Sequence, residues 1–308
     1  MAEMLYQRDV YGQTLVEMGR KNPNIVVFDA DLSGSTRTCL FAKEFKNRFF
    51  NFGVAEQNMM ATAAGMSSCG KTVFVSTFAI FATGRAWDQA RNTVSYSNSN
   101  VKIVATHAGI TVGPDGASHQ AVEDVALMRI IPTMKIMVPV DGPQTHDVIE
   151  AAVKMQGPFY VRLGRSKFPT LGIKEPFKFG EAQRLLEGRD LTIIACGIMV
   201  KAALDAANLL EKEGIRCRVM NIHTIKPIDK KAIIKAAEET KGIVVCEEHT
   251  VVGGLASAVD EVVAENYPVK VLRVGIKDRF GQSGEPDELM KEYGLTVDDI
   301  VKTCKKII

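Results

Sequence analysis

Short apolar runs alternate with amphipathic stretches along the first half of the chain. Five runs of four to six residues are rich in apolar and β-branched side chains, which is typical of strands buried on both faces of a parallel sheet. They lie at residues 25–28, 72–77, 101–105, 135–138 and 159–163. The stretches between them predict helices over residues 9–21, 57–68, 84–95, 121–130 and 143–155. This alternation predicts an α/β domain whose mostly parallel sheet is flanked by helices on both faces.

The pattern lapses over residues 166–188, which contain two prolines and three glycines and show no sustained period. A second α/β unit then begins with an apolar strand at 191–197. Its next helix has an apolar stripe at positions 199, 200, 203, 204, 207 and 210, and further strands are predicted at 216–222, 242–246 and 269–274. We therefore expect two α/β domains, residues 1–170 and 189–308, joined by a linker over residues 171–188.

Composition narrows the class of protein only slightly. A chain of 308 residues with 46% hydrophobic and 24% charged residues is ordinary for a soluble two-domain protein. The net charge of +2 gives no argument for binding nucleic acid or membranes, and the sequence shows neither a long apolar run nor a signal-peptide pattern. The six cysteines are scattered without a C-x-x-C pair. We expect a cytoplasmic protein with reduced thiols and neither a zinc site nor disulfides.

The segment around Glu56 carries the first candidate chemistry. It reads F-G-V-A-E-Q-N over residues 52–58, and the strand that follows ends at Phe78, with Phe81 three residues further on. Taken alone, a carboxylate at the start of a helix is most often a cap or a partner of the helix dipole. Taken alone, both phenylalanines would be core residues.

This segment resembles the pyrimidine-binding domain of thiamine-diphosphate enzymes, specifically the transketolase family. The resemblance implies that Glu56 hydrogen-bonds N1′ of the cofactor's aminopyrimidine. Apolar surroundings raise the proton affinity of a carboxyl group, so Glu56 would share a proton with the ring nitrogen. Phe81 would stack on the aminopyrimidine, and Phe78 would line the same pocket. The resemblance also places Asp31, in the turn after the first strand, at the cofactor.

A glycine-rich loop follows the predicted strand at 101–105. It reads T-H-A-G-I-T-V-G-P-D-G-A-S-H-Q over residues 106–120 and carries His107, Asp115 and His119. In an arbitrary protein these would be solvated loop residues. Two of the five histidines on one loop after a strand favour a binding site, because neutral imidazole can both donate and accept hydrogen bonds.

The loop resembles the substrate loop of transketolases at its first Thr-His, at Asp-Gly and at the final His-Gln. The resemblance implies that His107 contacts the sugar phosphate or a hydroxyl near it. Asp115 would bind the α-hydroxyl of the aldehyde acceptor, and His119 would bind the hydroxyl of the transferred two-carbon unit. With Glu56, the two histidines are the predicted catalytic residues.

Three further positions match those that bind the substrate phosphate in the family. Arg8 precedes the first helix, Ser35 lies in the turn after the first strand, and Arg165 follows the strand at 159–163. Arginine suits bidentate contacts with phosphate. Each of the three, taken alone, would be a solvated surface residue, so the prediction depends on their joint match with Glu56 and the loop.

The chain departs from the family pattern at a few positions. Gly84 stands where many transketolases have a tyrosine near the pyrimidine, and Pro114 replaces an acidic residue beside Asp115. These differences bear on the sugar preference more than on the reaction class.

The resemblance extends over the C-terminal part of the chain. Residues 190–308 resemble the C-terminal domain of transketolases, including D-R-F-G-Q-S-G at 278–284. Glu247, Glu248 and His249 end a strand in this domain, and we predict a structural role for all three.

One motif of the cofactor class is missing from the sequence. Thiamine-diphosphate enzymes hold the diphosphate through Mg²⁺ on a G-D-G…N motif, which supplies the oxygen ligands that Mg²⁺ prefers. The candidate at 113–116 reads G-P-D-G, and residues 141–143, where the asparagine would fall, read D-G-P. We therefore expect a separate N-terminal transketolase subunit to carry the diphosphate-binding domain and the metal ligands. The complex would be an α₂β₂ heterotetramer with thiamine diphosphate across the interface.

The sequence thus predicts one subunit of a transketolase, which moves a two-carbon ketol unit between sugar phosphates, as in the pentose phosphate pathway of carbohydrate metabolism. A split 1-deoxyxylulose-5-phosphate synthase is the nearest alternative, although it usually has an aspartate in place of His107. The β-subunit of a 2-oxoacid dehydrogenase has the same two-domain plan but lacks the paired loop histidines. A non-catalytic regulatory paralogue also remains open, and the intact Glu56, His119 and Arg165 argue against it.

Overall fold

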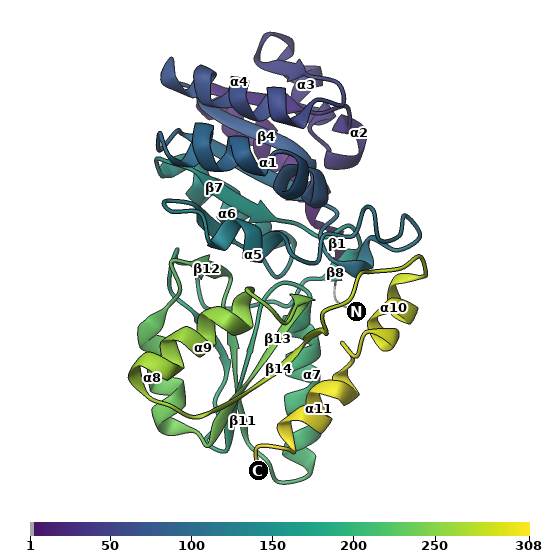
Figure 1. Cartoon of the computed structure of the whole chain (residues 1–308), viewed down its shortest axis with the longest axis vertical. Coiled ribbons are helices and arrows are strands. Elements are labelled where there is room, and N and C mark those ends of the chain that lie inside the picture. The colour runs from purple at the N-terminus through teal and green to yellow at the C-terminus, as the bar shows by residue number, and fades with distance from the viewer. Residues whose placement is uncertain (1–2) are drawn as a thin grey trace.

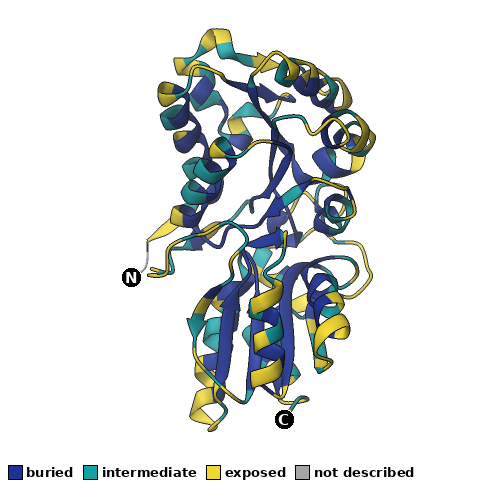
Figure 2. Ribbon diagram, turned by 90° about the vertical axis from the view of Figure 1, so that its left-hand side faces the viewer, coloured by how far each residue is buried: buried dark blue, intermediate teal, exposed yellow. Residues whose placement is uncertain are grey.

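A computed structural model describes residues 3–308, which form two α/β units stacked along the long axis of the molecule (Figure 1). Each unit is a mostly parallel sheet covered by helices on both faces, so the predicted fold class is confirmed. The strands of both sheets are largely buried, and the exposed residues lie mainly on the helices and loops around them (Figure 2). No helix within residues 3–308 is both long and apolar enough to cross a membrane.

The first sheet has seven strands in the order β12-β6-β7-β5-β4-β2-β3, and all neighbours are parallel except β12 and β6. Both faces of this sheet are buried. Successive side chains of a strand point to opposite faces, and Val26 packs in the core cluster on one face while Val27 packs in the cluster on the other. The strands are β2 (Ile25–Asp29), β3 (Phe49–Asn51), β4 (Thr72–Phe78), β5 (Val101–Thr106), β6 (Lys135–Met137), β7 (Phe159–Arg162) and β12 (Thr224–Lys226).

Helices cover both faces of this sheet. α1 (Gln7–Lys21) and α6 (Gly142–Lys154) pack on one face, and α4 (Glu56–Ser68) and α5 (Asp124–Arg129) pack on the other. Short helical turns complete the unit at α2 (Ser33–Thr36), α3 (Cys39–Glu44), η1 (Lys46–Arg48) and η4 (Ile110–Val112). A separate antiparallel pair joins β1 (Met4–Tyr6) to β8 (Lys167–Pro169), beside the second unit (Figure 1).

One predicted helix has a different form. In place of one α-helix over residues 84–95, the structure has two π-helical segments, η2 (Phe81–Arg85) and η3 (Gln89–Ser95), with residues 86–88 between them. Gly84 lies inside η2, and glycine is a poor residue for the interior of an α-helix. π-Helical turns often occur at functional sites.

The second sheet has five strands in the order β14-β13-β10-β11-β9, and only β9 and β11 are antiparallel neighbours. Its strands are β9 (Gln183–Leu186), β10 (Leu191–Ala195), β11 (Cys217–Asn221), β13 (Gly242–Thr250) and β14 (Lys270–Ile276). Its helices are α7 (Met199–Lys212), α8 (Lys230–Glu239), α9 (Leu255–Asn266), α10 (Pro286–Glu292) and α11 (Val297–Cys304). β9 lies inside the segment predicted as a linker, where Gln183-Arg184-Leu185-Leu186 is too short and polar to stand out as a strand.

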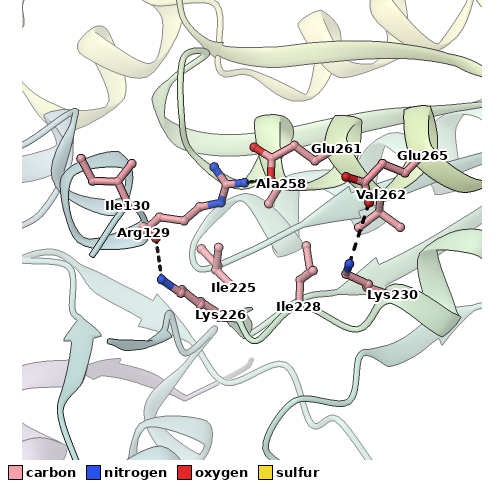
Figure 3. Close-up of a pocket in the computed structure, with 10 residues that line it drawn as sticks. All are labelled: Arg129, Ile130, Ile225, Lys226, Ile228, Lys230, Ala258, Glu261, Val262 and Glu265. Atoms are coloured by element: carbon pink, nitrogen blue, oxygen red, sulfur yellow. Dashed lines mark hydrogen bonds and ion pairs between the residues drawn. The ribbon is translucent and has the colours of Figure 1, made fainter. Parts of the chain in front are cut away.

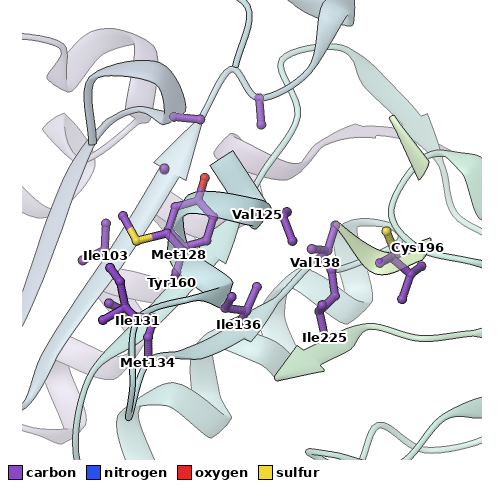
Figure 4. Packing of buried hydrophobic residues seen from close by; sticks show 14 of the residues in the cluster. Ile103, Val125, Met128, Ile131, Met134, Ile136, Val138, Tyr160, Cys196 and Ile225 are labelled. Atoms are coloured by element: carbon purple, nitrogen blue, oxygen red, sulfur yellow. The ribbon is translucent and has the colours of Figure 1, made fainter. Parts of the chain in front are cut away.

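One of the apolar clusters extends across both units. β12 follows β11 in the chain, yet it pairs with β6 of the first sheet. Val138, just after β6, packs in one cluster with Ile225 of β12 and with Cys196 of the second unit (Figure 4), and its backbone N–H donates to the carbonyl of His223 at 2.7 Å. The second unit is thereby fixed against the carboxyl end of β6.

Candidate active site

The predicted site residues follow the carboxyl ends of neighbouring parallel strands. Asp31 comes after β2, Phe81 comes after β4, His107 follows β5, and Arg165 comes after β7. Parallel strands end at one edge of their sheet, and α/β folds bind ligands at that edge. The topology therefore explains why residues so far apart in sequence lie on one side of the molecule.

Glu56 is the first residue of α4, and its side chain is only 1% exposed. Arg85 donates through Nη1 to both carboxylate oxygens, at 2.8 Å each. The surroundings of Glu56 are therefore not only apolar, because η2 brings a guanidinium to this carboxylate. The same guanidinium lies 4.6 Å from the ring centroid of Phe81, and the Arg85 side chain is 46% exposed, so the arginine reaches solvent while Glu56 does not.

Four rings gather beside this ion pair. The Phe78 ring stacks on His107 at 3.8 Å between centroids and lies 6.0 Å from Phe81, nearly parallel to it. The His119 ring meets Phe81 edge to face at 5.4 Å. The structure thus brings together the two phenylalanines and the two histidines that the sequence assigns to one site.

His107 is held in one orientation. Its φ is +59°, in the left-handed region, and its Nδ1 lies 2.9 Å from the Thr106 hydroxyl. Burial, followed by the nearby charges of Arg8 and Arg165, lowers the pKa of His107 to about 3. The imidazole is therefore neutral at neutral pH and can accept as well as donate a hydrogen bond.

A basic cavity of about 340 Å³ is lined by Tyr6, Arg8, Arg165, Ser166 and Lys167, and the charges of its two arginines act on His107. The Arg8 Nη1 donates to the Ser35 carbonyl at 3.4 Å, so Ser35 lies beside the cavity. Burial and the neighbouring positive charge of Arg37 lower the pKa of Arg8. Lys167 is not among the predicted site residues, although a lysine two residues after Arg165 is a visible signal for an anion site.

Two predicted residues stand apart from these contacts. Asp31 exchanges hydrogen bonds with Asn51 and is exposed, and Asp115 is exposed near the tip of the loop. Within residues 3–308, no hydrogen bond or ion pair links either aspartate to Glu56 or to the loop histidines. Gly84 is open on its Cβ side, because nothing lies within 4 Å of a Cβ built there.

A larger cavity, of about 500 Å³, lies elsewhere, between α5, β12 and α9 (Figure 3). None of its ten lining residues is a predicted site residue. Its charged side chains already have partners: Arg129 pairs with Glu261, and the Lys226 Nζ donates to the Arg129 carbonyl at 2.7 Å. This cavity is therefore a weaker candidate for the active site than the edge near Glu56.

The residues around Glu56 fit the aminopyrimidine half of thiamine diphosphate. A buried carboxyl group can share a proton with a ring nitrogen, and Phe78 and Phe81 offer flat apolar faces for the ring. Within the described residues, no group of three or more His, Cys, Asp or Glu side chains is placed to hold a metal ion.

Two family models match the chain. A family model described as "Transketolase, pyrimidine binding domain" matches residues 3–170. The chain belongs to the transketolase family. A second model, "Transketolase, C-terminal domain", matches residues 180–300, so the two matched domains of this transketolase chain lie on either side of residues 171–179.

Relatives show how much of a transketolase the chain represents. A Methanocaldococcus jannaschii protein, provisionally named as a transketolase C-terminal section, is 51% identical over 96% of this chain and 94% of its own length. Human (Homo sapiens) transketolase is 36% identical over 100% of this chain but only 50% of its own length. A solved structure entitled "Split gene transketolase, inactive beta4 tetramer" matches with a TM-score of 0.90 and 48% identity, over 99% of this chain and 98% of that chain. The chain thus corresponds to the C-terminal half of a transketolase.

Proposed function

We propose that this chain is the pyrimidine-binding subunit of a split transketolase, which transfers a two-carbon ketol unit between ketose and aldose sugar phosphates. The observation that carries the proposal is the arrangement at one sheet edge. This edge carries Glu56, the rings of Phe78 and Phe81, and the two loop histidines. A basic cavity on the same side of the molecule suits a sugar phosphate.

In this proposal Glu56 holds and moves a proton at N1′ of bound thiamine diphosphate. The cofactor supplies the carbon that carries the two-carbon unit, and the protein supplies placement and proton control. Phe81 stacks on the aminopyrimidine, Phe78 lines its pocket, and Asp31 lies at the cofactor's edge of the sheet. When the cofactor is bound, the Glu56 carboxyl group contacts both Arg85 and the ring nitrogen, or Arg85 moves outward. The Arg85 side chain is exposed enough to make this movement.

The sugar is bound by the loop and the basic cavity. His107 contacts the sugar phosphate or a hydroxyl near it, and His119 hydrogen-bonds the hydroxyl of the transferred two-carbon unit. Asp115, at the loop's tip, binds the α-hydroxyl of the acceptor aldehyde. The phosphate is bound by Ser35 and by the cationic side chains that border the cavity, Arg8, Arg165 and Lys167.

We further propose that a separate N-terminal transketolase subunit provides the diphosphate-binding domain with its Mg²⁺ ligands. Support comes from the span of the chain: it covers half of human transketolase but nearly all of a relative named as a C-terminal section. Because the solved relative is a tetramer of one chain, self-association is also proposed, in an α₂β₂ assembly. A cytoplasmic location remains a prediction from sequence.

The phosphate contacts provide the test of the proposed substrates. We expect Arg165→Ala and Arg8→Ala to raise KM for glyceraldehyde 3-phosphate about tenfold or more, because each charge-assisted contact contributes roughly 1.5–3 kcal/mol. KM for unphosphorylated glyceraldehyde should change little. The measurement is steady-state ketol transfer by the assembled enzyme. Arg184→Ala is the matched control, since Arg184 pairs with Glu187 on the surface of the second unit.

Two outcomes would contradict the proposal. Equal changes in KM for both acceptors would mean that the arginines have only a structural role. Consumption of pyruvate with glyceraldehyde 3-phosphate, without cleavage of a ketose, would identify a 1-deoxyxylulose-5-phosphate synthase instead.

A further inference from the structure

The C-terminal domain contacts loop 106–120 directly through Glu248 of β13. The Glu248 Oε1 accepts a hydrogen bond from the backbone N–H of Thr111 at 2.7 Å, and the Glu248 side chain is buried. Gly109 lies against the same carboxylate, since a Cβ built at Gly109 would be 2.2 Å from the Glu248 Cδ. The loop can approach this closely only because residue 109 is glycine, whose φ here is +82°.

A second contact joins the end of the loop to the same domain. The Gln120 Nε2 donates to the carbonyl oxygens of Ile110 at 3.2 Å and Gly113 at 3.1 Å, both within the loop. It also donates to the carbonyl of Gln282, at 2.9 Å, in the C-terminal domain. The shape of the loop therefore depends on two separate segments of that domain.

Glu248 is itself fixed by the first domain. Arg162 of β7 donates through Nη2 to the Glu248 backbone carbonyl at 2.9 Å and through Nε to Asp124 at 2.8 Å. Burial raises the pKa of the Glu248 carboxyl, and the Arg162 charge and the Thr111 hydrogen bond oppose that rise. Because a buried carboxylate without hydrogen-bond partners is costly, Glu248 favours the loop geometry that presents the Thr111 N–H.

We propose that Glu248 is a positioning residue for the sugar substrates. It holds Thr111 in the middle of a loop that carries His107 at its start, Asp115 at its tip and His119 near its end. The C-terminal domain would thus contribute to sugar affinity through the loop. This inference rests on the sugar-binding role proposed above for the loop.

Glu247 offers a matched control in the same strand. It is also buried, but its Oε2 and Oε1 accept the backbone N–H groups of Leu255 and Ala256, at 2.8 and 2.9 Å. These are the first residues of α9, so the contacts of Glu247 stay inside the C-terminal domain. Truncation of either glutamate removes a buried acceptor, and only Glu248 contacts the loop.

The first experiment is amide hydrogen exchange on the complete chain, which requires no activity. Glu248→Ala should speed exchange in peptides that cover 106–120 by about tenfold, because the Thr111 amide loses its acceptor. Glu248→Gln keeps an acceptor oxygen and should restore protection. Glu247→Ala should instead speed exchange at the start of α9. If Glu248→Ala does not fold, Glu248→Asp is the substitute. It withdraws the carboxylate by one methylene group and so also removes the acceptor from the Thr111 amide.

The second experiment separates sugar binding from cofactor binding in the enzyme assembled with its N-terminal subunit. Glu248→Ala should raise KM for both ketose donor and aldose acceptor about tenfold, with an unchanged Kd for thiamine diphosphate. Glu248→Gln should return KM to near the original value, and Glu247→Ala should leave it unchanged. This pattern separates positioning from a general loss of stability, which would affect both alanine variants alike.

Unchanged exchange in the loop of Glu248→Ala, or equal changes in KM for both alanine variants, would overturn the inference. An assembled wild-type enzyme without ketol transfer would contradict the proposed function instead. In that case faster exchange in the loop would still show that Glu248 positions it, while the claim about sugar affinity would be lost.

Discussion

Replacement of Glu56 by glutamine should lower turnover about 10²–10⁴-fold in the assembled enzyme and leave the chain folded. The amide cannot share a proton with N1′ of the aminopyrimidine, whereas a carboxyl group can. Glutamine has nearly the same volume and keeps an oxygen acceptor, so the start of α4 should retain its structure. The measurement is the rate of ketol transfer at saturating cofactor and sugars, with circular dichroism as the check on folding. Turnover near that of the wild type would contradict the role assigned to Glu56.

The same variant weakens the ion pair with Arg85, and this loss needs its own control. Arg85→Gln removes the guanidinium that donates to both carboxylate oxygens but leaves the carboxylate in place. Because the Arg85 side chain is half exposed, its removal should leave most of the turnover intact. A loss as large as that of Glu56→Gln would show that the ion pair, and not proton sharing, explains the first result.

The sequence predicts the strands of the first sheet well because they are buried on both faces. β2 and β5 are composed mainly of apolar and β-branched residues, and their predicted positions agree with the structure to within one residue at either end. β12 could not be predicted in the same way. It is three residues long and pairs with a strand of the other domain, so its stability comes from a distant part of the chain.

The candidate site is predictable where strand ends bring residues together. Phe78 and His107 each lie at the end of a parallel strand, and those strands, β4 and β5, are neighbours, so their ring contact follows from the topology. The contacts of Arg85 and Glu248 could not be predicted in this way. Their partners, Glu56 and Thr111, lie 29 and 137 residues away, and no local period relates the members of either pair.

The isolated chain should bind thiamine diphosphate weakly and show no ketol transfer. Its predicted contacts are with the aminopyrimidine and the sugar, whereas the diphosphate–Mg²⁺ motif is missing from its sequence. Trp87, the only tryptophan, lies two residues after Arg85 and donates to the Leu127 carbonyl at 2.9 Å. Cofactor binding near Glu56 can therefore be followed by the fluorescence of Trp87 and, independently, by calorimetry on the whole chain.

Addition of the N-terminal subunit should restore activity and tighten cofactor binding. The cofactor bridges the two polypeptides in this proposal, so each of the two ligands, cofactor and partner, stabilises the state that binds the other. The apparent Kd for thiamine diphosphate should fall as the partner is titrated, and activity should rise over the same range of partner concentration. The relative described as an inactive tetramer of one chain is consistent with this dependence. Tight, Mg²⁺-dependent binding of thiamine diphosphate to the pure chain would contradict it, because the chain would then hold the diphosphate without a partner.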